Sequence, residues 1–472
     1  MNSKDSVLLN ASEFIKDRLY FICVKCTVDV KCTPSLHYFT LNEDIKYDSF
    51  YEDFGPMNLA MIYRYCMKLN KKLSNSGLKT KKIIHYVNDC TKEARERRVN
   101  SAFLIGAYSI IYLCYTPEQA FETLTKNSSK GYLKFRDASF GEPYTITLLD
   151  CLKGIKKALD YGFFNFNDFD YLKYEYYEQV ENGDFNWIVP DKFIAFCGPQ
   201  EVPHSWGDHK PESYFPYFRS HNVSTIIRLN KKTYDSNIFR KAGFDHKDLY
   251  FVDGGTPSES VLQQFISISE NAKGVIAVHC KAGLGRTGSL IGCYIMKHYK
   301  FTAEEAIAWI RICRPGSIIG PQQSWLQEKQ KQMWKTGESY RKENCLKAPI
   351  KHKTGIYSLT RGMDDKINPH PVSLQKIGEK VDHKDLESDE EYKKGSQGDQ
   401  LNRIKLKRRR VANVNSCNHK QRKSSGKVSF ASFYEGLTNN HNKPKKRVLS
   451  EEQGIKRKTK LLRKNLSDSV DM

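Results

Sequence analysis

One short run of the sequence, residues 274–296, constrains the fold more than any other. An apolar stretch, 274–278, is followed by the loop His-Cys-Lys-Ala-Gly-Leu-Gly-Arg-Thr-Gly at 279–288 and then by a second apolar stretch, 289–296. A buried strand, a loop of small residues and a helix N-terminus in this order aim several backbone amides at one anion. The run therefore predicts an α/β domain with a phosphate-sized anion site at the end of a parallel strand.

Two residues of this loop, Cys280 and Arg286, carry specific chemistry. The inward amides, the helix dipole and Arg286 all favour the thiolate of Cys280, and such surroundings lower a cysteine pKa from about 8.5 to about 3.5–7.5. Arg286 can hold two phosphate oxygens with its planar guanidinium group, and the Thr287 hydroxyl can donate to the Cys280 sulfur. A structural cysteine beside a glycine turn is the alternative, but it leaves Arg286 opposing the helix dipole without an anion. Five further loop residues are expected to bind the substrate: Lys281, Ala282, Gly283, Leu284 and Gly285.

A thiolate that displaces an alcohol or phenol oxygen needs a proton donor, and Asp253 is the predicted general acid. It follows an apolar segment, 249–252, and precedes two glycines, on a loop that can close over a phosphate. An ordinary turn aspartate is the alternative reading of this position. Gln322, in the segment 318–323, is predicted to position water for hydrolysis of a phosphocysteine, with a plain surface loop as its alternative.

The helix after the loop has an ungapped echo earlier in the chain. The pattern Leu-Ile-Gly-x-Tyr occurs at 104–108 and 290–294, and Thr-x-Glu-x-Ala occurs at 116–120 and 302–306. In this register Cys280 falls on Ala94 and Arg286 falls on Asn100. A register shared by two helices favours duplication over two unrelated helices with threonine caps. It predicts an N-terminal domain of the same type without the nucleophile, in which a strand at 82–86 leads into a polar loop at 90–100.

An acidic, tyrosine-rich segment, 168–184, separates the two copies and is predicted to be a linking helix. Glu175 and Glu178 lie three residues apart and share a face of such a helix, and Asp184 follows its end. An acidic helix face is usually solvated surface. Where it borders an active site, it selects substrates with a basic residue near the phosphate.

The sequence at these positions resembles the cell division cycle fourteen family of dual-specificity protein phosphatases over about residues 12–340. The resemblance rests on five motifs: 279–288, Cys-Arg-Pro-Gly-Ser at 313–317, Ile-Gly-Pro-Gln-Gln at 319–323, Asn-Trp-Ile-Val-Pro at 186–190 and Asp-Phe-Gly-Pro at 53–56. It implies two tandem dual-specificity-phosphatase folds, each with a central, mostly parallel sheet flanked by helices. The expected parts are an inactive domain (1–160), a linker helix (161–184), a catalytic domain (185–340) and a disordered basic tail (341–472).

The same resemblance implies a substrate and an acidic groove. It implies dephosphorylation of phosphoserine followed by proline and then a basic residue, as left by cyclin-dependent kinases, and a role in mitotic exit. It assigns Cys280, Arg286 and Asp253 to catalysis and places Ala282 in a pocket for the proline. The acidic groove of the family corresponds by spacing to three residues: Glu175, Glu178 and Asp184. The expected partners are phosphoprotein substrates of proline-directed kinases.

Charge and cysteine content add predictions about location and partners. Of the formal net charge of +22, residues 341–472 contribute 32 basic against 16 acidic residues. Three basic clusters, 405–410, 443–447 and 456–460, are candidates for binding nuclear-import receptors. They predict a nuclear or nucleolar protein with pools in the cytoplasm, at the centrosome or on the spindle, and a solvated tail is the alternative. Nucleic-acid binding is not expected to be the primary role.

Metal sites and membrane insertion are not expected. The 13 cysteines form no disulfide pattern, which is typical of an intracellular, reducing environment. The lone Cys-x-x-Cys at 23–26 has no second ligand pair, so no metal and no cofactor is predicted. The longest apolar stretch, 103–115, is too short to span a bilayer.

Two other functions remain as alternatives to a protein phosphatase. A phosphoinositide phosphatase favours a second basic residue inside the loop, where this sequence has Leu284. A phosphopeptide-binding scaffold would have lost its catalytic residues, and only the N-terminal copy shows such losses.

Overall fold

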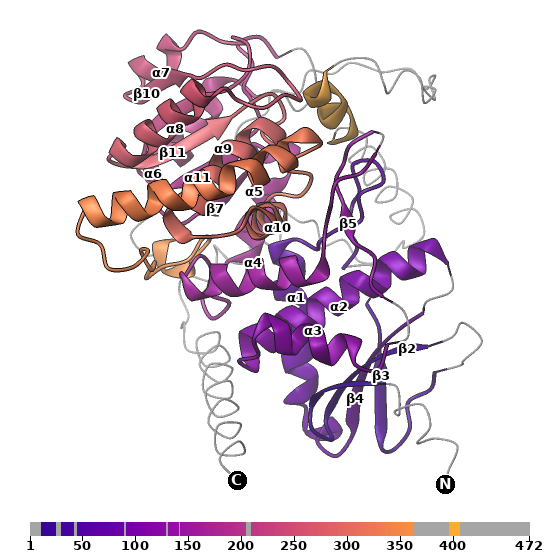
Figure 1. Cartoon of the computed structure of the whole chain (residues 1–472). Helices are drawn as coiled ribbons and strands as arrows, with labels where there is room; N and C mark the ends of the chain where they lie inside the picture. Colours follow the sequence, from indigo (N-terminus) through magenta and orange to yellow (C-terminus); the bar gives the residue numbers. More distant parts are fainter. Residues whose placement is uncertain are drawn as a thin grey trace, which may run out of the picture. The chain divides into compact units, whose positions relative to one another are not determined.

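The computed structural model describes residues 11–24, 30–41, 45–88, 91–128, 131–140, 142–203, 209–362 and 396–405. All of them belong to one compact unit, residues 1–405 (Figure 1). Within it, two α/β domains follow one another along the chain, as the duplicated helix pattern predicts. The basic clusters 443–447 and 456–460, and all but Lys405 of 405–410, lie outside the described residues.

The first domain is built on a sheet whose strand order is β1-β2-β4-β3. The strand β4 runs parallel to β2 and β3, whereas β1 and β2 form an antiparallel pair. The strands are β1 (Ser12–Ile15), β2 (Leu19–Val24), β3 (Leu36–Phe39), β4 (Lys82–Asn88), β5 (Phe135–Arg136) and β6 (Thr145–Ile146). The helices are α1 (Leu59–Leu73), η2 (Ser76–Leu78), α2 (Lys92–Tyr112), α3 (Pro117–Thr125) and α4 (Leu148–Asp160).

The second domain repeats this topology with the order β10-β9-β11-β8-β7. The strand β11 runs parallel to β8 and β9, and β7 pairs antiparallel with β8. The strands are β7 (Phe185–Val189), β8 (Phe193–Phe196), β9 (Val223–Arg228), β10 (Asp245–Asp248) and β11 (Val275–His279). The helices are η4 (Pro211–Tyr214), α6 (Phe215–Ser220), α7 (Asn237–Lys241), α8 (Glu259–Asn271), α9 (Gly285–Tyr299), α10 (Ala303–Cys313), α11 (Pro321–Glu343) and η5 (Leu359–Gly362).

The two domains share one continuous hydrophobic core. A single cluster of buried side chains includes Leu104 and Leu152 of the first domain and Ile291 and Trp309 of the second. Gly154 lets α4 approach α10 closely, because a Cβ atom there would lie 2.9 Å from the Glu305 carbonyl oxygen. Figure 1 shows α4 beside α10 at the junction. The pair therefore packs as one body rather than as two domains on a flexible linker.

The linker helix in the structure is much shorter than the predicted one, which covered residues 161–184. Helix α5 covers only Tyr171–Glu178 and is followed by η3 (Val180–Asn182), while residues 161–170 are irregular. Asp170 caps α5 by accepting from the Lys173 amide. Gly183, at φ +115°, ends the segment in a conformation that favours glycine.

The predicted start of the tail at residue 341 is wrong for the residues that the structure describes there. Helix α11 continues to Glu343, and Ile356 and Tyr357 are buried and bond through their backbones to Phe163 and Asp170, in the segment between α4 and α5. Residues 397–405 form a further helical segment whose Leu401 and Ile404 are buried. The charge count over 341–472 did not reveal these short apolar segments, because basic residues surround them in the sequence. Within the described part of the chain, no helix is both long and apolar enough to cross a lipid bilayer.

Candidate active site

The loop between β11 and α9 forms the floor of the candidate site. Strand β11 is fully buried and ends at His279, and α9 begins at Gly285. Gly283 adopts φ +67°, and a side chain there would collide with the Phe196 backbone, so glycine is required on both counts. The helix has no side-chain cap, and its first amides are left for a ligand.

Cys280 lies at the start of this loop and is 3 % exposed. Burial alone would raise the pKa of its thiol. Arg286 and the hydroxyl and amide of Thr287 oppose burial, and the net result is a lowered pKa for Cys280. The Thr287 hydroxyl has no oxygen or nitrogen partner among the described residues, which leaves it available to the sulfur. These contacts therefore shift Cys280 towards the thiolate, the form that can act as a nucleophile.

Arg286 and Asp253 face each other across the loop. A terminal nitrogen of Arg286 lies 3.0 Å from a carboxylate oxygen of Asp253, and the other donates to the Phe251 carbonyl at 3.1 Å. The Arg286 Nε is buried and has no partner among the described residues. A bound phosphate would satisfy this donor. The geometry thus brings the predicted nucleophile, phosphate-binding arginine and general acid to one site.

Arg314 braces the loop from behind, and sequence reasoning gave it no role. It donates to the carbonyls of Gly283 at 2.7 Å and Ala282 at 3.0 Å, and it pairs with Asp184 at 2.9 Å and Asn186 at 2.8 Å. Holding these carbonyls outward turns the loop amides inward. The signal in the sequence was the motif Cys-Arg-Pro-Gly-Ser at 313–317, which was used only for the resemblance.

His279 orders the loop as a neutral side chain. It is fully buried, and burial lowers its pKa to about 3. Its Nδ1 lies 2.9 Å from the Cys280 carbonyl oxygen, and its Nε2 lies 2.7 Å from the Tyr234 hydroxyl, which also reaches His246 at 2.9 Å. A histidine that stays neutral over the physiological pH range positions Cys280 and moves no proton.

Gln322 links the phosphate loop to the loop of the general acid. It is fully buried, its oxygen accepts from the Ile319 amide at 3.0 Å, and its nitrogen donates to the Gly255 carbonyl at 3.2 Å. It also lies against Gly285 at the start of α9. These contacts place it beside the site, and its predicted work on water stays a prediction.

The first domain supplies part of the wall around the loop. Phe50 and Ala138 form a small buried cluster with Ala282, Leu284 and Ile319. Phe50 also packs against Gly316, and Asp137 accepts from the Gly320 amide at 2.7 Å. Asp53, from the motif at 53–56, holds this wall by accepting from the Phe50 amide at 2.7 Å. Ala282 and Leu284 therefore meet an apolar surface rather than solvent.

The three predicted groove acids have three different environments. Glu175 is paired with Arg64 at 2.6 Å, so its charge is already matched. Burial raises the pKa of Glu178 to about 7, and its carboxyl lies 3.2 Å from Asn58 Nδ2 and 3.1 Å from the Tyr174 hydroxyl. Burial also acts against ionised Asp184, but Arg314 and Lys405 overcome it and lower its pKa. Of these three, Asp184 is the charged acid whose cationic partners, Arg314 and Lys405, both bond to the Ala282 carbonyl of the loop.

A segment from the far end of the described chain, residues 397–405, lies across this site (the gold helix in Figure 1). The Gly398 amide donates to Asp253 at 2.9 Å, and Asp399 pairs with Lys281. Gln397 contacts Gly285, and Lys405 donates to Asp184 at 2.5 Å and to the Ala282 carbonyl at 3.1 Å. The segment thus lies against Asp253, Lys281 and Ala282, and its position could not be inferred from the sequence.

The corresponding place in the first domain is closed. Ala94, which shares the register of Cys280, lies inside α2, because β4 ends at Asn88 and this helix begins at Lys92. The prediction that the segment before Asn100 is a polar loop is therefore wrong from Lys92 onward. Asn100 donates to the Phe54 carbonyl and so fills the place of a phosphate-binding arginine.

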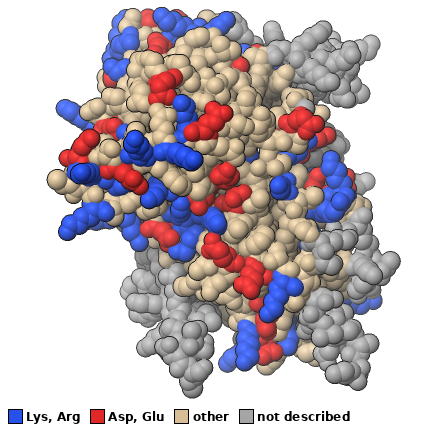
Figure 2. Space-filling view, in the orientation of Figure 1, with Lys and Arg blue, Asp and Glu red and all other residues tan. Residues whose placement is uncertain are grey.

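The surface of the described residues carries both signs of charge. Figure 2 shows lysine and arginine side chains interspersed with aspartate and glutamate over the face that it displays. This agrees with the charge count, which places most of the basic excess after residue 340. Selectivity for a basic group is therefore expected to come from individual acids such as Asp184.

Comparison with known proteins agrees with this geometry. The family "Dual specificity protein phosphatase, N-terminal half" matches residues 13–158, and "Dual specificity phosphatase, catalytic domain" matches residues 226–332. The chain is 51 % identical over 414 residues to the human "Dual specificity protein phosphatase CDC14A", an alignment that covers 86 % of this chain and 68 % of that protein. It is 48 % identical to the mouse CDC14B phosphatase over 85 % of this chain and 81 % of that protein. It is 46 % identical to "Tyrosine-protein phosphatase cdc-14" of Caenorhabditis elegans over 70 % of this chain and 48 % of that protein.

Proposed function

The chain belongs to the CDC14 family of dual specificity protein phosphatases, and we propose that it hydrolyses phosphoserine, phosphothreonine and phosphotyrosine in proteins through a phosphocysteine intermediate. The observation that carries the proposal is Cys280 with its lowered pKa, seated under Arg286 at the N-terminus of α9. This arrangement supplies a nucleophile, a phosphate grip and an amide cradle in one loop.

In the first step the Cys280 sulfur attacks phosphorus. The bond from phosphorus to the substrate oxygen breaks, and Asp253 gives its proton to that oxygen as it leaves. Arg286 exchanges its contact with Asp253 for two phosphate oxygens and balances the charge that they carry.

In the second step water attacks the phosphorus of the phosphocysteine. The Asp253 carboxylate takes the proton from water, the sulfur–phosphorus bond breaks, and Cys280 leaves as the thiolate that Thr287 stabilises. Inorganic phosphate is released, and both side chains return to their starting protonation states. Gln322, which already links the two loops, is the proposed guide for the attacking water.

We extend the proposal to substrates in which proline and then a basic residue follow the phosphorylated serine. Lys405 supports this preference, because it shows that a lysine side chain fits between Asp184 and the Ala282 carbonyl beside the loop. The apolar wall of Phe50, Leu284 and Ile319 suits a proline ring. Substrates of this kind are made by proline-directed kinases, which places the proposed role in the cell cycle.

Nuclear or nucleolar residence is part of the same proposal. It is supported by the three basic clusters at 405–410, 443–447 and 456–460, which are candidate ligands for import receptors. Removal of the second and third clusters is expected to shift a fluorescently tagged chain from nucleus to cytoplasm. An unchanged distribution would contradict this part of the proposal.

The test of the activity compares substrates on the full chain. Peptides carrying phosphoserine-proline with Lys or with Ala two residues after the proline are compared with a phosphotyrosine peptide and a phosphoinositide. The phosphoserine-proline-x-lysine peptide is expected to have the highest kcat/KM. Faster turnover of the phosphoinositide, or activity that survives Cys280→Ser, would overturn the proposal.

The groove is tested by Asp184→Asn, with Glu175→Gln as the matched control. A charge-assisted hydrogen bond contributes about 1.5–3 kcal/mol, so Asp184→Asn is expected to reduce the ratio of kcat/KM for the Lys and Ala peptides about tenfold or more. Glu175→Gln is expected to leave the ratio within about twofold, because Arg64 already holds Glu175. The ratio is the readout because Asp184→Asn also releases Lys405, which affects both peptides equally.

A further inference from the structure

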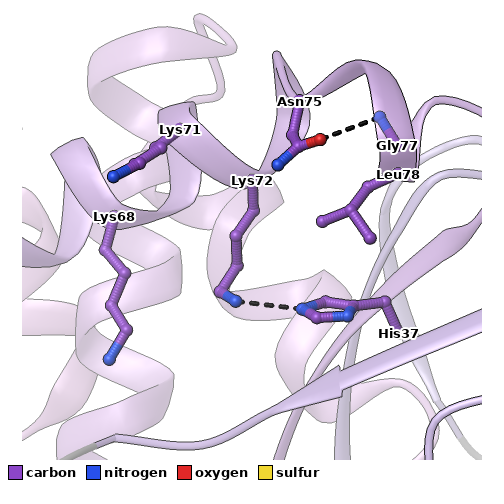
Figure 3. Close-up of a pocket in the computed structure, with 7 residues that line it drawn as sticks. All are labelled: His37, Lys68, Lys71, Lys72, Asn75, Gly77 and Leu78. Carbon is purple, nitrogen blue, oxygen red and sulfur yellow. Dashed lines mark hydrogen bonds between the residues drawn. The ribbon is translucent and has the colours of Figure 1, made fainter.

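Three lysines of the first domain gather on one face of α1. Lys71 and Lys72 follow Lys68 by three and four residues, so each of them is a neighbour of Lys68 on the helix surface. Together with His37 of β3 they line a pocket of about 480 Å³, which Asn75, Gly77 and Leu78 complete (Figure 3). Small-molecule sites in proteins have volumes of about 300–1,000 Å³, so a ligand of that kind fits.

The positive charge of this pocket is not neutralised by any residue that the structure describes. Among the residues that the structure describes, no carboxylate lies within ion-pair distance of these three ammonium groups. Burial and then the charge of Lys68 lower the pKa of Lys72, which shows that the lysines repel one another. Like charges at this spacing oppose helix formation, so their grouping has a cost to the fold.

The end of the helix accounts for only two of the three lysines. Lys71 and Lys72 lie in the last turn of α1, where cations interact favourably with the free carbonyls. Lys68 lies one turn earlier, and its Nζ is buried without a hydrogen-bond partner among the described residues. A buried ammonium group without a partner is costly, and a bound anion would remove that cost.

His37 holds Lys72 in place without adding charge. The Lys72 Nζ lies 2.9 Å from the His37 Nε2, as the dashed line in Figure 3 marks. Burial and the neighbouring Lys72 and Lys81 lower the pKa of His37, so its Nε2 can accept from the ammonium group. The charge of the pocket therefore comes from the lysines alone, and Lys72 is fixed at its edge.

We propose that this pocket binds a small anion carrying two or more phosphate groups, of the inositol polyphosphate class, either free or as the headgroup of a lipid. One phosphate carries about −1.5 to −2 charges and cannot match three ammonium groups, whereas two phosphates can. Lysine binds phosphate as a point charge and needs no fixed fork geometry, which suits a ring with phosphates in several directions. The pocket is independent of the catalytic loop and of the proposed function.

The test measures binding of inositol hexakisphosphate by isothermal titration calorimetry to the full chain at about 0.15 M salt, where exposed charges are screened beyond about 8 Å. The chain carries Arg286→Ala, so that the catalytic loop does not take up the probe. The pocket variant is Lys68→Gln/Lys71→Gln/Lys72→Gln. The control, Lys16→Gln/Lys46→Gln/Lys126→Gln, removes the same charge from exposed lysines of the same domain.

The pocket variant is expected to weaken binding at least tenfold, and the control variant by less than twofold. Equal losses in the two variants would mean that the probe senses only net charge, and would overturn the proposal. A second arm uses phosphatidylcholine vesicles with or without 5 % phosphatidylinositol 4,5-bisphosphate, chosen as about one anionic ligand in twenty lipids. Pocket-dependent binding to these vesicles identifies the lipid source, and pocket-dependent binding of the soluble probe alone identifies the free anion. The Arg286→Ala chain is not expected to hydrolyse phosphate esters, so activity is measured with Arg286 in place. There, the pocket variant and the control variant should each hydrolyse p-nitrophenyl phosphate within twofold of the unmodified chain.

Discussion

The two domains share the order of four strands, to which the second domain adds β10, and they differ at the point where the central strand meets its helix. In each, a central parallel strand leads into a long buried helix, and a threonine capping box begins the next helix. In the second domain β11 ends at His279 and α9 begins at Gly285, which leaves a loop between them. In the first domain the residues in the register of that loop, 94–98, are already helical. A phosphate site on this fold thus depends on a loop between the strand and the helix as much as on a cysteine.

The supports of the loop differ in the same way. Arg314 holds two loop carbonyls outward in the second domain, and Ser128 occupies its register in the first. There, Asn100 and Phe135 lie against Gly55, so backbone and side chains fill the place where phosphate would bind. The first domain has instead become a wall of the neighbouring site, through Phe50 and Asp137.

The largest effect is expected from restoring the cysteine and the arginine in the first domain, which tests whether the loop or the residues are missing there. In a Cys280→Ser background, Ala94→Cys/Asn100→Arg is expected to recover no activity, because Ala94 lies in helical backbone whose amides are already bonded. Cys280→Ser alone is expected to lower kcat by about 10⁴-fold or more, since removing a nucleophile that acts as part of a unit has effects of that order. The readout is turnover of p-nitrophenyl phosphate.

The thermal midpoint of Cys280→Ser should stay close to that of the unmodified chain. This control separates a lost nucleophile from a lost fold. Measurable turnover by the restored first domain would show that residue identity, and not the loop, was the missing part.

The candidate phosphate-binding loop could be predicted from the sequence because its pattern is local. Strand, loop and helix are contiguous from 274 to 296, so their chemistry could be inferred without knowing what packs around them. The duplication could also be predicted, since two helices kept one register. In the first domain the predicted start of the helix after β4 was wrong, because an ungapped register assigns the same loop length to both copies.

Long-range contacts were beyond the sequence for a physical reason. Arg314, Asp184 and Lys405 are far apart in the chain and meet only in the folded protein. The helical spacing predicted that Glu175 would face the substrate, but its carboxylate is paired with Arg64 instead. A sequence pattern shows which faces side chains share within one element, but not which partner from another element reaches them first.

Removing the brace is expected to produce the next largest effect. Arg314→Ala leaves Asp184 with one cation and frees two loop carbonyls, and loss of one partner of a buried pair costs about 3–5 kcal/mol. Urea unfolding should show this loss, and kcat/KM should fall with it. The double variant Arg314→Ala/Asp184→Ala should lose less stability than the sum of the single changes, because the Arg314–Asp184 pair is lost only once, while Lys405 loses its carboxylate partner in the double variant as it does in Asp184→Ala alone. Additive losses would mean that the two side chains act separately.

The junction between the domains gives a test through pH. Glu178 bonds to Asn58 of the first domain, and its pKa rises from 4.5 to about 7 on folding, chiefly because of burial. The folded chain therefore holds a proton that the unfolded chain has lost between these two pH values, so this contribution to stability is complete below pH 4.5 and is lost as pH rises through 7. The size of the loss is about 3 kcal/mol.

Glu178→Gln should remove this pH dependence, because glutamine does not titrate and retains the size of the side chain. The comparison is the change in free energy of unfolding between pH 5 and pH 8 in the two proteins. If both change by the same amount, Glu178 is ionised throughout and the junction tolerates its charge. A single unfolding transition in both would further support one continuous core across the domains.

The smallest expected effect sharpens what the two domains retain in common. Thr116 accepts from the Gln119 amide at 3.1 Å and Thr302 accepts from the Glu305 amide at 3.2 Å, each at the start of the helix after the long buried one. Replacing either threonine with alanine should cost about 1 kcal/mol in urea unfolding, with kcat unchanged. Glu305 also accepts from Lys157 of α4 at 2.5 Å, so loosening the second box could in addition weaken the contact between the domains. A loss of unfolding free energy for Thr302→Ala clearly above that for Thr116→Ala would therefore locate extra stability at this junction. Equal losses would show that the two caps contribute alike in the two domains.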